Sequence, residues 1–215
     1  MSGSTASLIE VRALSCVRGS ARLFSGLDLI LGAGELMHVA GANGSGKTSL
    51  LRILCGLSEP ASGEVRWRGA PAASVRDDWR SGLLYLGHRN AVKDDFTPLE
   101  NLRASAAIAG DTTPGDVLLR ALVDIGLGAR LDVPARSLSQ GQRRRVALAR
   151  LLADTRSALW ILDEPFTALD TGAVAVLSRA MAAHLARGGA IVYTTHQPVD
   201  INAARRQTLN LDDFS

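Results

Sequence analysis

The sequence predicts an α/β fold in which helices cover both faces of a parallel sheet. Segments with strand character alternate with segments of helical periodicity along much of the chain. In addition, an apolar strand at 36–40 runs straight into a glycine-rich turn and then a helix, a connection typical of such sheets. The length of 215 residues indicates one domain, 1–215, with room for a modest insertion.

The composition excludes several classes of protein. With 47% hydrophobic and 21% charged residues, the chain can bury a large core and is neither disordered nor collagen-like. An aromatic content of 4% argues against a nucleic-acid platform of stacked aromatic rings. Cys16 and Cys55 form no CxxC pattern, so neither a disulfide framework nor a zinc site is predicted, and a reducing cytosol is expected. The net charge of +3 is too small to identify a partner.

Strands dominate the first part of the chain. Apolar residues predict strands at 8–11, 27–31 and 36–40, with a Gly-Ala-Gly turn at 32–34. A helix is expected at 49–57, followed by strands at 64–67 and 83–86 and a surface loop at 71–79. The first ten residues lack the basic and apolar parts of a leader, and no window is apolar enough to span a bilayer. We therefore expect a chain that is neither exported nor self-anchored.

Helical periodicity dominates the middle of the chain. Two helices are expected between 98 and 127, separated by the breakers at 110–115, and a third at 141–153. The block 88–153 is interpreted as an inserted helical subdomain, with 1–87 and 154–215 forming the core domain around it. Strands follow at 158–162 and 190–195, with a helix at 173–186 between them. His184 on that helix is expected to be solvated.

A phosphate-binding motif follows the strand at 36–40. Residues 41–48 match GxxxxGK[ST], in which glycines let successive N–H groups turn toward an anion at a helix N-terminus. Lys47 is expected to reach the β- and γ-phosphates and the Thr48 hydroxyl to bind Mg²⁺. Lysine occurs elsewhere only at Lys93. A turn without a ligand is the alternative, disfavoured by the strand before and the helix after. The predicted ATP contacts here are Gly41, Ala42, Asn43, Gly44, Ser45, Gly46, Lys47, Thr48 and Ser49.

Two adjacent carboxylates follow the apolar strand 159–162. Because side chains alternate in direction at a strand end, Asp163 and Glu164 can take different roles. We expect Asp163 to hold Mg²⁺ through water and Glu164 to polarise the attacking water. Acids at strand ends are often simply solvated, which is the competing interpretation.

The segment 138–146, LSQGQRRRV, resembles the LSGGQ signature of ATP-binding cassette (ABC) proteins, with Gln140 where glycine is common. Ser139, Gly141 and Gln142 would form a second anion cradle at a helix start. In the family this cradle closes on the γ-phosphate held by the partner subunit. The resemblance therefore implies a homodimer that holds two ATP molecules between its subunits.

Further parts of the family pattern follow in order. Residues 168–170 resemble the D-loop at the dimer interface, and His196 resembles the switch histidine that would bond the γ-phosphate and orient Glu164. Two positions depart from the pattern. His88 stands where a metal-linked glutamine is usual, and could still contact a metal-bound water. Arg18 stands near the usual adenine-stacking aromatic residue, and either stacks on the base or is a solvated charge.

Nearly the whole chain resembles one branch of the family, the haem-exporter ATPases of cytochrome c maturation. The segments that carry this resemblance are 23–27, 87–88, 159–168 and 194–198. It implies a P-loop NTPase fold with a parallel core sheet, an N-terminal antiparallel β subdomain and the helical insertion. It also implies an ATP hydrolase peripheral to the cytoplasmic face of the inner membrane. Such a subunit would work with membrane-spanning partners in haem export or in release of a haem-loaded chaperone.

Other functions remain as alternatives. The four histidines show no spacing suggestive of a porphyrin site, so no direct haem binding is expected. Another ABC transporter is possible, whereas a DNA-associated ABC ATPase is disfavoured because no heptad array or cysteine cluster is present. A non-hydrolytic regulatory module is disfavoured by the Asp163–Glu164 pair. The basic run 143–145 is interpreted as a solvated or interface face rather than a nucleic-acid site. Segment 88–103 is either a docking region for a membrane partner or an ordinary polar loop.

Overall fold

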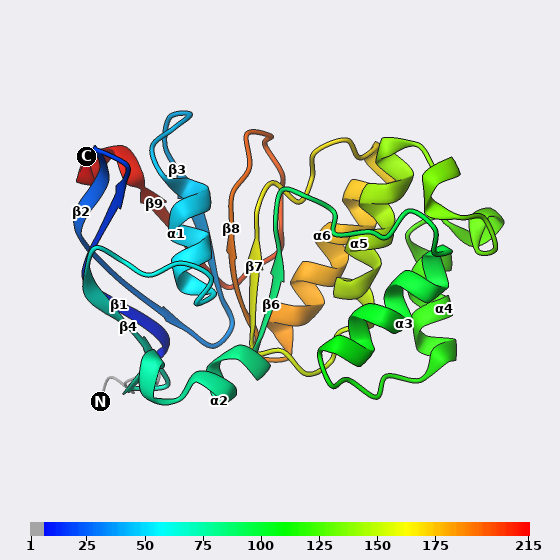
Figure 1. Ribbon diagram of the computed structural model, residues 1–215, viewed down its shortest axis with the longest axis horizontal. Coiled ribbons are helices and arrows are strands. Elements are labelled where there is room, and N and C mark those ends of the chain that lie inside the picture. The colour runs from blue at the N-terminus through cyan, green and yellow to red at the C-terminus, as the bar shows by residue number, and fades with distance from the viewer. Residues whose placement is uncertain (1–6) are drawn as a thin grey trace.

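A computed structural model describes residues 7–215 as two sheets with helices around them. Residues 1–6, part of the stretch from which no leader is expected, lie outside the described residues. Figure 1 shows the order of the layers: the antiparallel sheet, then α1, then the parallel sheet, then the remaining long helices. Among residues 7–215, no helix is both long enough and apolar enough to cross a bilayer.

The antiparallel sheet is built from the N-terminal half of the chain. Its strand order is β2-β1-β4-β5, and β1 pairs with both β2 and β4. The strands are β1 (Ser7–Arg18), β2 (Ala21–Gly32), β4 (Ser62–Trp67) and the two-residue β5 (Ala70–Pro71). The apolar residues of β1 and β2 that point inward, such as Ile9, Leu14 and Leu27, are fully buried. This alternation is what a sheet with one solvated face requires.

The parallel sheet has the order β6-β7-β8-β3-β9, with all neighbours parallel. Its strands are β3 (Glu35–Ala40), β6 (Leu83–Leu86), β7 (Leu159–Leu162), β8 (Ala190–Tyr193) and β9 (Arg205–Asn210). All residues of β7 and β8 are buried, as expected for strands covered on both faces. Because the strands are parallel, the segments after β3, β6, β7 and β8 meet at one edge of the sheet.

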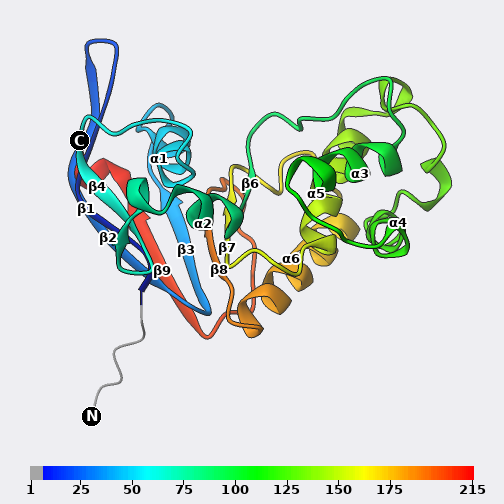
Figure 2. The same cartoon turned by 60° about the horizontal axis from the view of Figure 1, so that its bottom comes forward.

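Helices cover the two faces of the parallel sheet. Helix α1 (Lys47–Leu54) packs between the sheets, and Leu159 and Ile161 of β7 face the same apolar cluster. Trp160 and Leu162 face the opposite cluster, which contains residues of α3 (Pro98–Ile108), α4 (Gly115–Asp124), α5 (Gln140–Ala153) and α6 (Thr171–Ala186). In Figure 2, α3 and α4 lie farther from the sheet than α6 does. The helical segment therefore shares its core with one face of the sheet.

The α/β prediction is confirmed, two local predictions are wrong, and one strand was missed. The expected surface loop at 71–79 contains the short 3-10 helix η1 (Ala72–Ser74) and the start of α2 (Arg76–Ser81), and Trp79 is buried. His184 is not solvated, because its exposed fraction is 0%. The C-terminal strand β9 was not predicted, since its polar sequence has no apolar alternation, and a short helix η4 (Leu211–Phe214) follows it.

Candidate functional site

The carboxyl ends of the parallel strands meet around a cavity of about 270 Å³, which we call the strand-end cavity. Ligands bind at this edge in open α/β sheets because loops from neighbouring strands converge there. The loop after β3 and the segments after β6, β7 and β8 all contribute to the cavity wall. Its lining consists of Arg18, Leu23, Asn43, Gly44, Gly46, Lys47, Thr48, Ser49, His88, Asp163, Glu164 and His196.

The glycine loop, residues 41–48, adopts backbone conformations that favour glycine. Gly46 is the N-cap of α1, with φ of 104°. A methyl group on Gly46 would lie 3.1 Å from side-chain carbons of Leu23 and Phe24. At Gly41, with φ of 139°, a methyl would lie 2.6 Å from Ser45 Oγ. At both positions a side chain would strain the backbone and crowd neighbouring atoms, so both favour glycine.

The polar atoms of the glycine loop are arranged for an anion. Lys47 Nζ donates to the carbonyls of Gly41 at 2.7 Å and Ala42 at 2.9 Å, which folds the ammonium over the loop. Ser45 Oγ is buried and has no hydrogen-bond partner among residues 7–215. The Ala42 N–H instead donates to both carboxylate oxygens of Asp212 in η4, at 3.1 Å each. A phosphate would supply acceptors to the ammonium and the unpaired hydroxyl.

Asp163 lies at the centre of a small network of oxygen atoms. Its side chain accepts hydrogen bonds from Thr48 Oγ1 at 2.9 Å and from Thr194 Oγ1 at 3.0 Å, and only 3% of the residue is exposed. Among the described residues, no group of three or more His, Cys, Asp and Glu could hold a metal ion. A hydroxyl and one carboxylate nevertheless suit Mg²⁺, which commonly completes its shell with phosphate oxygens and water. The residues present therefore fit a nucleotide-bound Mg²⁺.

Glu164 has a backbone conformation that is rare for its residue type. Its φ is 50°, in the left-handed region, which costs on the order of 1 kcal/mol for a residue with a side chain. The N–H of Glu164 donates to Thr194 Oγ1 at 2.9 Å. Its Oε1 is buried without a hydrogen bond among the described residues, although His196 Nε2 lies 3.4 Å away. This arrangement leaves one carboxylate oxygen free beside the strand-end cavity.

Arg144 was missed by the sequence analysis, which interpreted the basic run as a solvated or interface face. Its exposed fraction is 5%, and its guanidinium donates to the carbonyls of Asp163 at 3.1 Å and Glu164 at 2.7 Å. Burial lowers the pKa of this guanidinium, while the charges of Asp163 and Glu164 oppose that shift. No sequence signal distinguished it from the more exposed Arg143. Arg145 is also mostly buried and pairs with Asp170, the N-cap of α6.

The signature segment forms the N-terminus of α5, which begins at Gln140 with Ser139 as N-cap. Ser139 Oγ accepts from the N–H of Gln142, and Gln142 Oε1 accepts from the N–H of Ser139. Neither Ser139, Gly141 nor Gln142 lines the strand-end cavity. Gln140 instead lines a neighbouring cavity of about 80 Å³ together with His88, Asn90, Arg144, Glu164, Thr167 and Ala168.

Two of the departures from the family pattern, at Arg18 and His88, lie at the strand-end cavity. Arg18, from the end of β1, and His88, from the segment after β6, are exposed and contribute to its lining. Leu23 of β2 also lines the cavity. The structure therefore brings both residues to the cavity, and the roles of both stay predictions.

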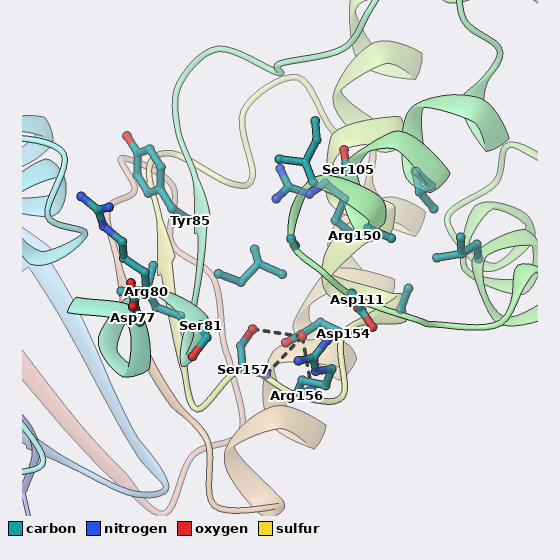
Figure 3. Close-up of a pocket in the computed structure, with 18 residues that line it drawn as sticks. Asp77, Arg80, Ser81, Tyr85, Ser105, Asp111, Arg150, Asp154, Arg156 and Ser157 are labelled. Carbon is teal, nitrogen blue, oxygen red and sulfur yellow. Dashed lines mark hydrogen bonds and ion pairs between the residues drawn. The ribbon is translucent and has the colours of Figure 1, made fainter. Parts of the chain in front are cut away.

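A second cavity, of about 400 Å³, lies between the sheet and the helical segment. Figure 3 shows Arg80, Ser81 and Tyr85 on one side of it and Ser105 and Arg150 on the other. Its lower wall contains charged residues of both signs, namely Asp111, Asp154 and Arg156. We call it the interlayer cavity. Leu102 of α3, within segment 88–103, contributes to it.

Comparison with known proteins identifies the family. The model of the ABC transporter family matches residues 24–167, more than half of the chain. The chain belongs to the ABC transporter family. A solved structure of an ATP-binding subunit of an ABC transporter has 27% identity and a TM-score of 0.78, covering 88% of this chain and 79% of that one. An ABC transporter ATP-binding protein from Pyrococcus furiosus, with 24% identity and a TM-score of 0.80 over 96% of this chain and 98% of that one, shares the fold.

Curated relatives within the ABC transporter family are still more similar. The cytochrome c biogenesis ATP-binding export protein of Aromatoleum aromaticum is 55% identical over 184 residues, which are 86% of each chain. Its counterpart in Dechloromonas aromatica is 52% identical over 204 residues, 95% of this chain and all of that one. The protein is thus an ATP-binding ABC transporter ATPase, and its P-loop NTPase fold is confirmed by the solved relatives.

Proposed function

We propose that this ABC ATPase hydrolyses ATP in the strand-end cavity to drive haem export, or release of a haem-loaded chaperone, in cytochrome c maturation. One observation carries the catalytic part: the glycine loop, Asp163, Glu164 and His196 come from distant parts of the chain and line a single cavity. The process is inferred from the relatives, which are named as cytochrome c biogenesis export proteins and resemble this chain along nearly its whole length.

Each residue has a distinct proposed role in hydrolysis. The N–H groups of the glycine loop and the Lys47 ammonium bind the phosphates, so the contacts of Lys47 with Gly41 and Ala42 give way to phosphate oxygens. Glu164 accepts a hydrogen bond from the attacking water through its free Oε1 and orients it. His196, whose Nε2 lies 3.4 Å from that oxygen, donates its ring N–H to the γ-phosphate and lies beside the carboxylate that it orients.

Thr48 and Asp163 are the proposed Mg²⁺ residues. Their mutual hydrogen bond places the Thr48 hydroxyl oxygen and the Asp163 carboxylate side by side at the end of the glycine loop. Bound Mg²⁺ would neutralise charge that develops on the phosphate oxygens. Thr194 fixes the other oxygen of Asp163 and so orients the carboxylate.

We propose that two copies of the chain form the complete ATP site. The start of α5 carries N–H groups and the Ser139 hydroxyl, which suit an anion, yet Ser139, Gly141 and Gln142 do not line the strand-end cavity. The start of α5 in one subunit would therefore contact the phosphates of an ATP molecule that is bound in the strand-end cavity of the second subunit. Arg18 is proposed to stack on the adenine and His88 to contact the metal-bound water.

We propose that the chain forms a complex with membrane-spanning subunits at the cytoplasmic face of the inner membrane. Segment 88–103 is the proposed docking region for a cytoplasmic helix of such a subunit. In support, this segment borders the interlayer cavity, and the nearby Ile108 at the end of α3 is 83% exposed. The inserted helical subdomain 88–153 would transmit this contact to the ATP site.

Two variants test the catalytic assignment. We expect Glu164→Gln to bind ATP normally but to lose turnover by a factor on the order of 10³, since only the attack of water is impaired. Lys47→Ala should instead weaken nucleotide binding itself. Phosphate release and the affinity for a fluorescent ATP analogue, measured on the purified full-length chain, separate the two effects. Normal turnover by Glu164→Gln would contradict the role of this carboxylate.

A complementation experiment tests the biological role. The chain is expressed in a bacterium that lacks its own cytochrome c biogenesis ATP-binding export protein, and c-type cytochromes are detected by haem staining. The wild-type chain is expected to restore the stained bands, whereas Glu164→Gln at equal abundance is not. If the wild-type chain hydrolyses ATP and assembles at the membrane but restores no stained band, the export proposal is wrong, although the ATPase assignment stands.

A further inference from the structure

The Glu164 peptide is held on both sides by side chains from other elements. Its N–H donates to Thr194 Oγ1, which follows β8, and its carbonyl accepts from Arg144 Nη2 of α5 at 2.7 Å. Thr194 has an exposed fraction of 0% and Arg144 of 5%, so neither contact competes with bulk water. A left-handed residue with a side chain persists only where its surroundings hold it in place. These two contacts meet that requirement.

The same guanidinium also reaches the segment after β6. Arg144 Nη1 donates to the Gly87 carbonyl at 3.2 Å and to Asn90 Oδ1 at 3.1 Å. Arg144 therefore joins three parts of the chain: α5, the end of β7, and the segment that carries His88. Four acceptors arranged around one planar group need the fork of donors that arginine provides and lysine does not.

We propose that Arg144 is a positioning residue for ATP hydrolysis which, together with Thr194, holds the Glu164 peptide so that its carboxylate faces the strand-end cavity. This inference rests on the proposed role of Glu164. Neither residue lines the strand-end cavity, and neither is expected to touch ATP. Their loss should therefore lower the rate of hydrolysis rather than the affinity for nucleotide. Through Gly87 and Asn90, Arg144 also ties the orientation of Glu164 to the segment proposed to contact the membrane partner.

The test compares variants of the purified full-length chain. Arg144→Met keeps an unbranched apolar stem but removes the guanidinium and every donor, and we expect kcat to fall on the order of 10²-fold, because misplacing a catalytic group by about 1 Å has that effect. The KM for ATP and the Mg²⁺ concentration for half-maximal activity should change less than about threefold. Arg144→Lys should retain an intermediate kcat. Arg143→Ala is the matched control, because that side chain is more exposed and its polar contacts among residues 7–215 are with Asp94 and the Arg136 carbonyl.

Variants of Thr194 provide a second test if Arg144→Met folds poorly. Thr194→Val keeps the shape but can neither accept from the Glu164 N–H nor donate to Asp163 Oδ1, whereas Thr194→Ser keeps the hydroxyl and both contacts, so the Mg²⁺ concentration for half-maximal activity is measured alongside kcat. We expect the valine variant to lose kcat and the serine variant to stay near wild type, at similar melting temperatures. Wild-type kcat in folded Arg144→Met, or in Thr194→Val, would overturn the inference. If Glu164→Gln itself turned over normally, the proposed function would fail first, so the two failures are distinguishable.

Discussion

At the scale of single residues, the proposed ATP site contains buried polar atoms that lack hydrogen-bond partners among the described residues. Ser45 Oγ and Glu164 Oε1 are buried without hydrogen bonds among the described residues. Buried polar atoms are normally paired, and an unpaired one costs on the order of 1–3 kcal/mol. Ser45 belongs to the glycine loop and Glu164 lines the strand-end cavity, so both atoms are consistent with a site that ATP and water complete.

The conformation of Gly46 gives a prediction at this scale. Gly46→Ala and Gly110→Ala both place a methyl group on a residue with positive φ, so each should lose about 1 kcal/mol of unfolding free energy. Only the Gly46 methyl would press on neighbours, namely Leu23 and Phe24, whereas Gly110 has open space around it. We expect Gly46→Ala to lose at least about tenfold in ATP affinity, which corresponds to about 1.4 kcal/mol. Titration with a fluorescent ATP analogue and urea unfolding give the two quantities, and equal ATP affinity in both variants would contradict the prediction.

At the scale of elements, buried polar contacts hold α6 against the parallel sheet. His184 of α6 stacks on Trp160 of β7 with ring centroids 4.0 Å apart. Its Nε2 lies 3.2 Å from the Ala190 carbonyl and its Nδ1 accepts from Arg187 at 2.9 Å, so a neutral ring satisfies both. Trp160 Nε1 in turn donates to Asp154 Oδ2. These contacts fix the end of α6 far from the ATP site.

The neutral state of His184 predicts a pH dependence of stability. Burial, followed by the charge of Arg187, lowers the pKa of His184 to about 4 from the usual 6.5, against the opposing charge of Asp154. The unfolded chain therefore binds a proton between pH 6.5 and about 4 that the folded chain does not. The contribution of His184 to stability is complete above pH 6.5 and should fall by about 3 kcal/mol as the pH drops through this window.

Urea unfolding at several pH values checks this prediction, with His184→Gln as the comparison. The variant lacks the titrating group, so its unfolding free energy should change less steeply than that of the wild type between pH 6.5 and 4. Because the carboxylates titrate in both proteins, the difference between the two slopes is the informative quantity. Identical slopes would show that His184 does not contribute to the pH dependence.

At the scale of the whole molecule, the proposed ATP site is divided between two copies of the chain. In that arrangement, Lys47→Ala inactivates both sites of its own homodimer, because each site loses the ammonium that binds phosphate. Ser139→Arg also inactivates both sites of its own homodimer, because the arginine side chain blocks the start of α5. A mixed dimer has one site with both changes and one site with neither. Mixing the two inactive variants is therefore expected to restore ATPase activity.

Equal amounts of the two variants should form a mixed dimer in about half of all pairs, by random assortment, and so recover about a quarter of the wild-type sites. Phosphate release measured after mixing gives this fraction. The double variant Lys47→Ala with Ser139→Arg, mixed with either single variant, is the control and should stay inactive. No recovery from the first mixture, with dimers present by light scattering, would place Ser139 and Lys47 in the same site of one chain.

The sequence by itself determined the α/β class, the long helices, the glycine loop and the acids after β7, because local periodicity and residue spacing carry these features. Only the tertiary structure decided which polar side chains are buried. Arg144 lies in a run of three arginines, and His184 is an ordinary polar residue on a helix, so neither has a local signal. Likewise, β9 is a strand because its backbone pairs with β3, not because of its side chains. Burial and long-range hydrogen bonding depend on residues far apart in the chain, and no local pattern encodes them.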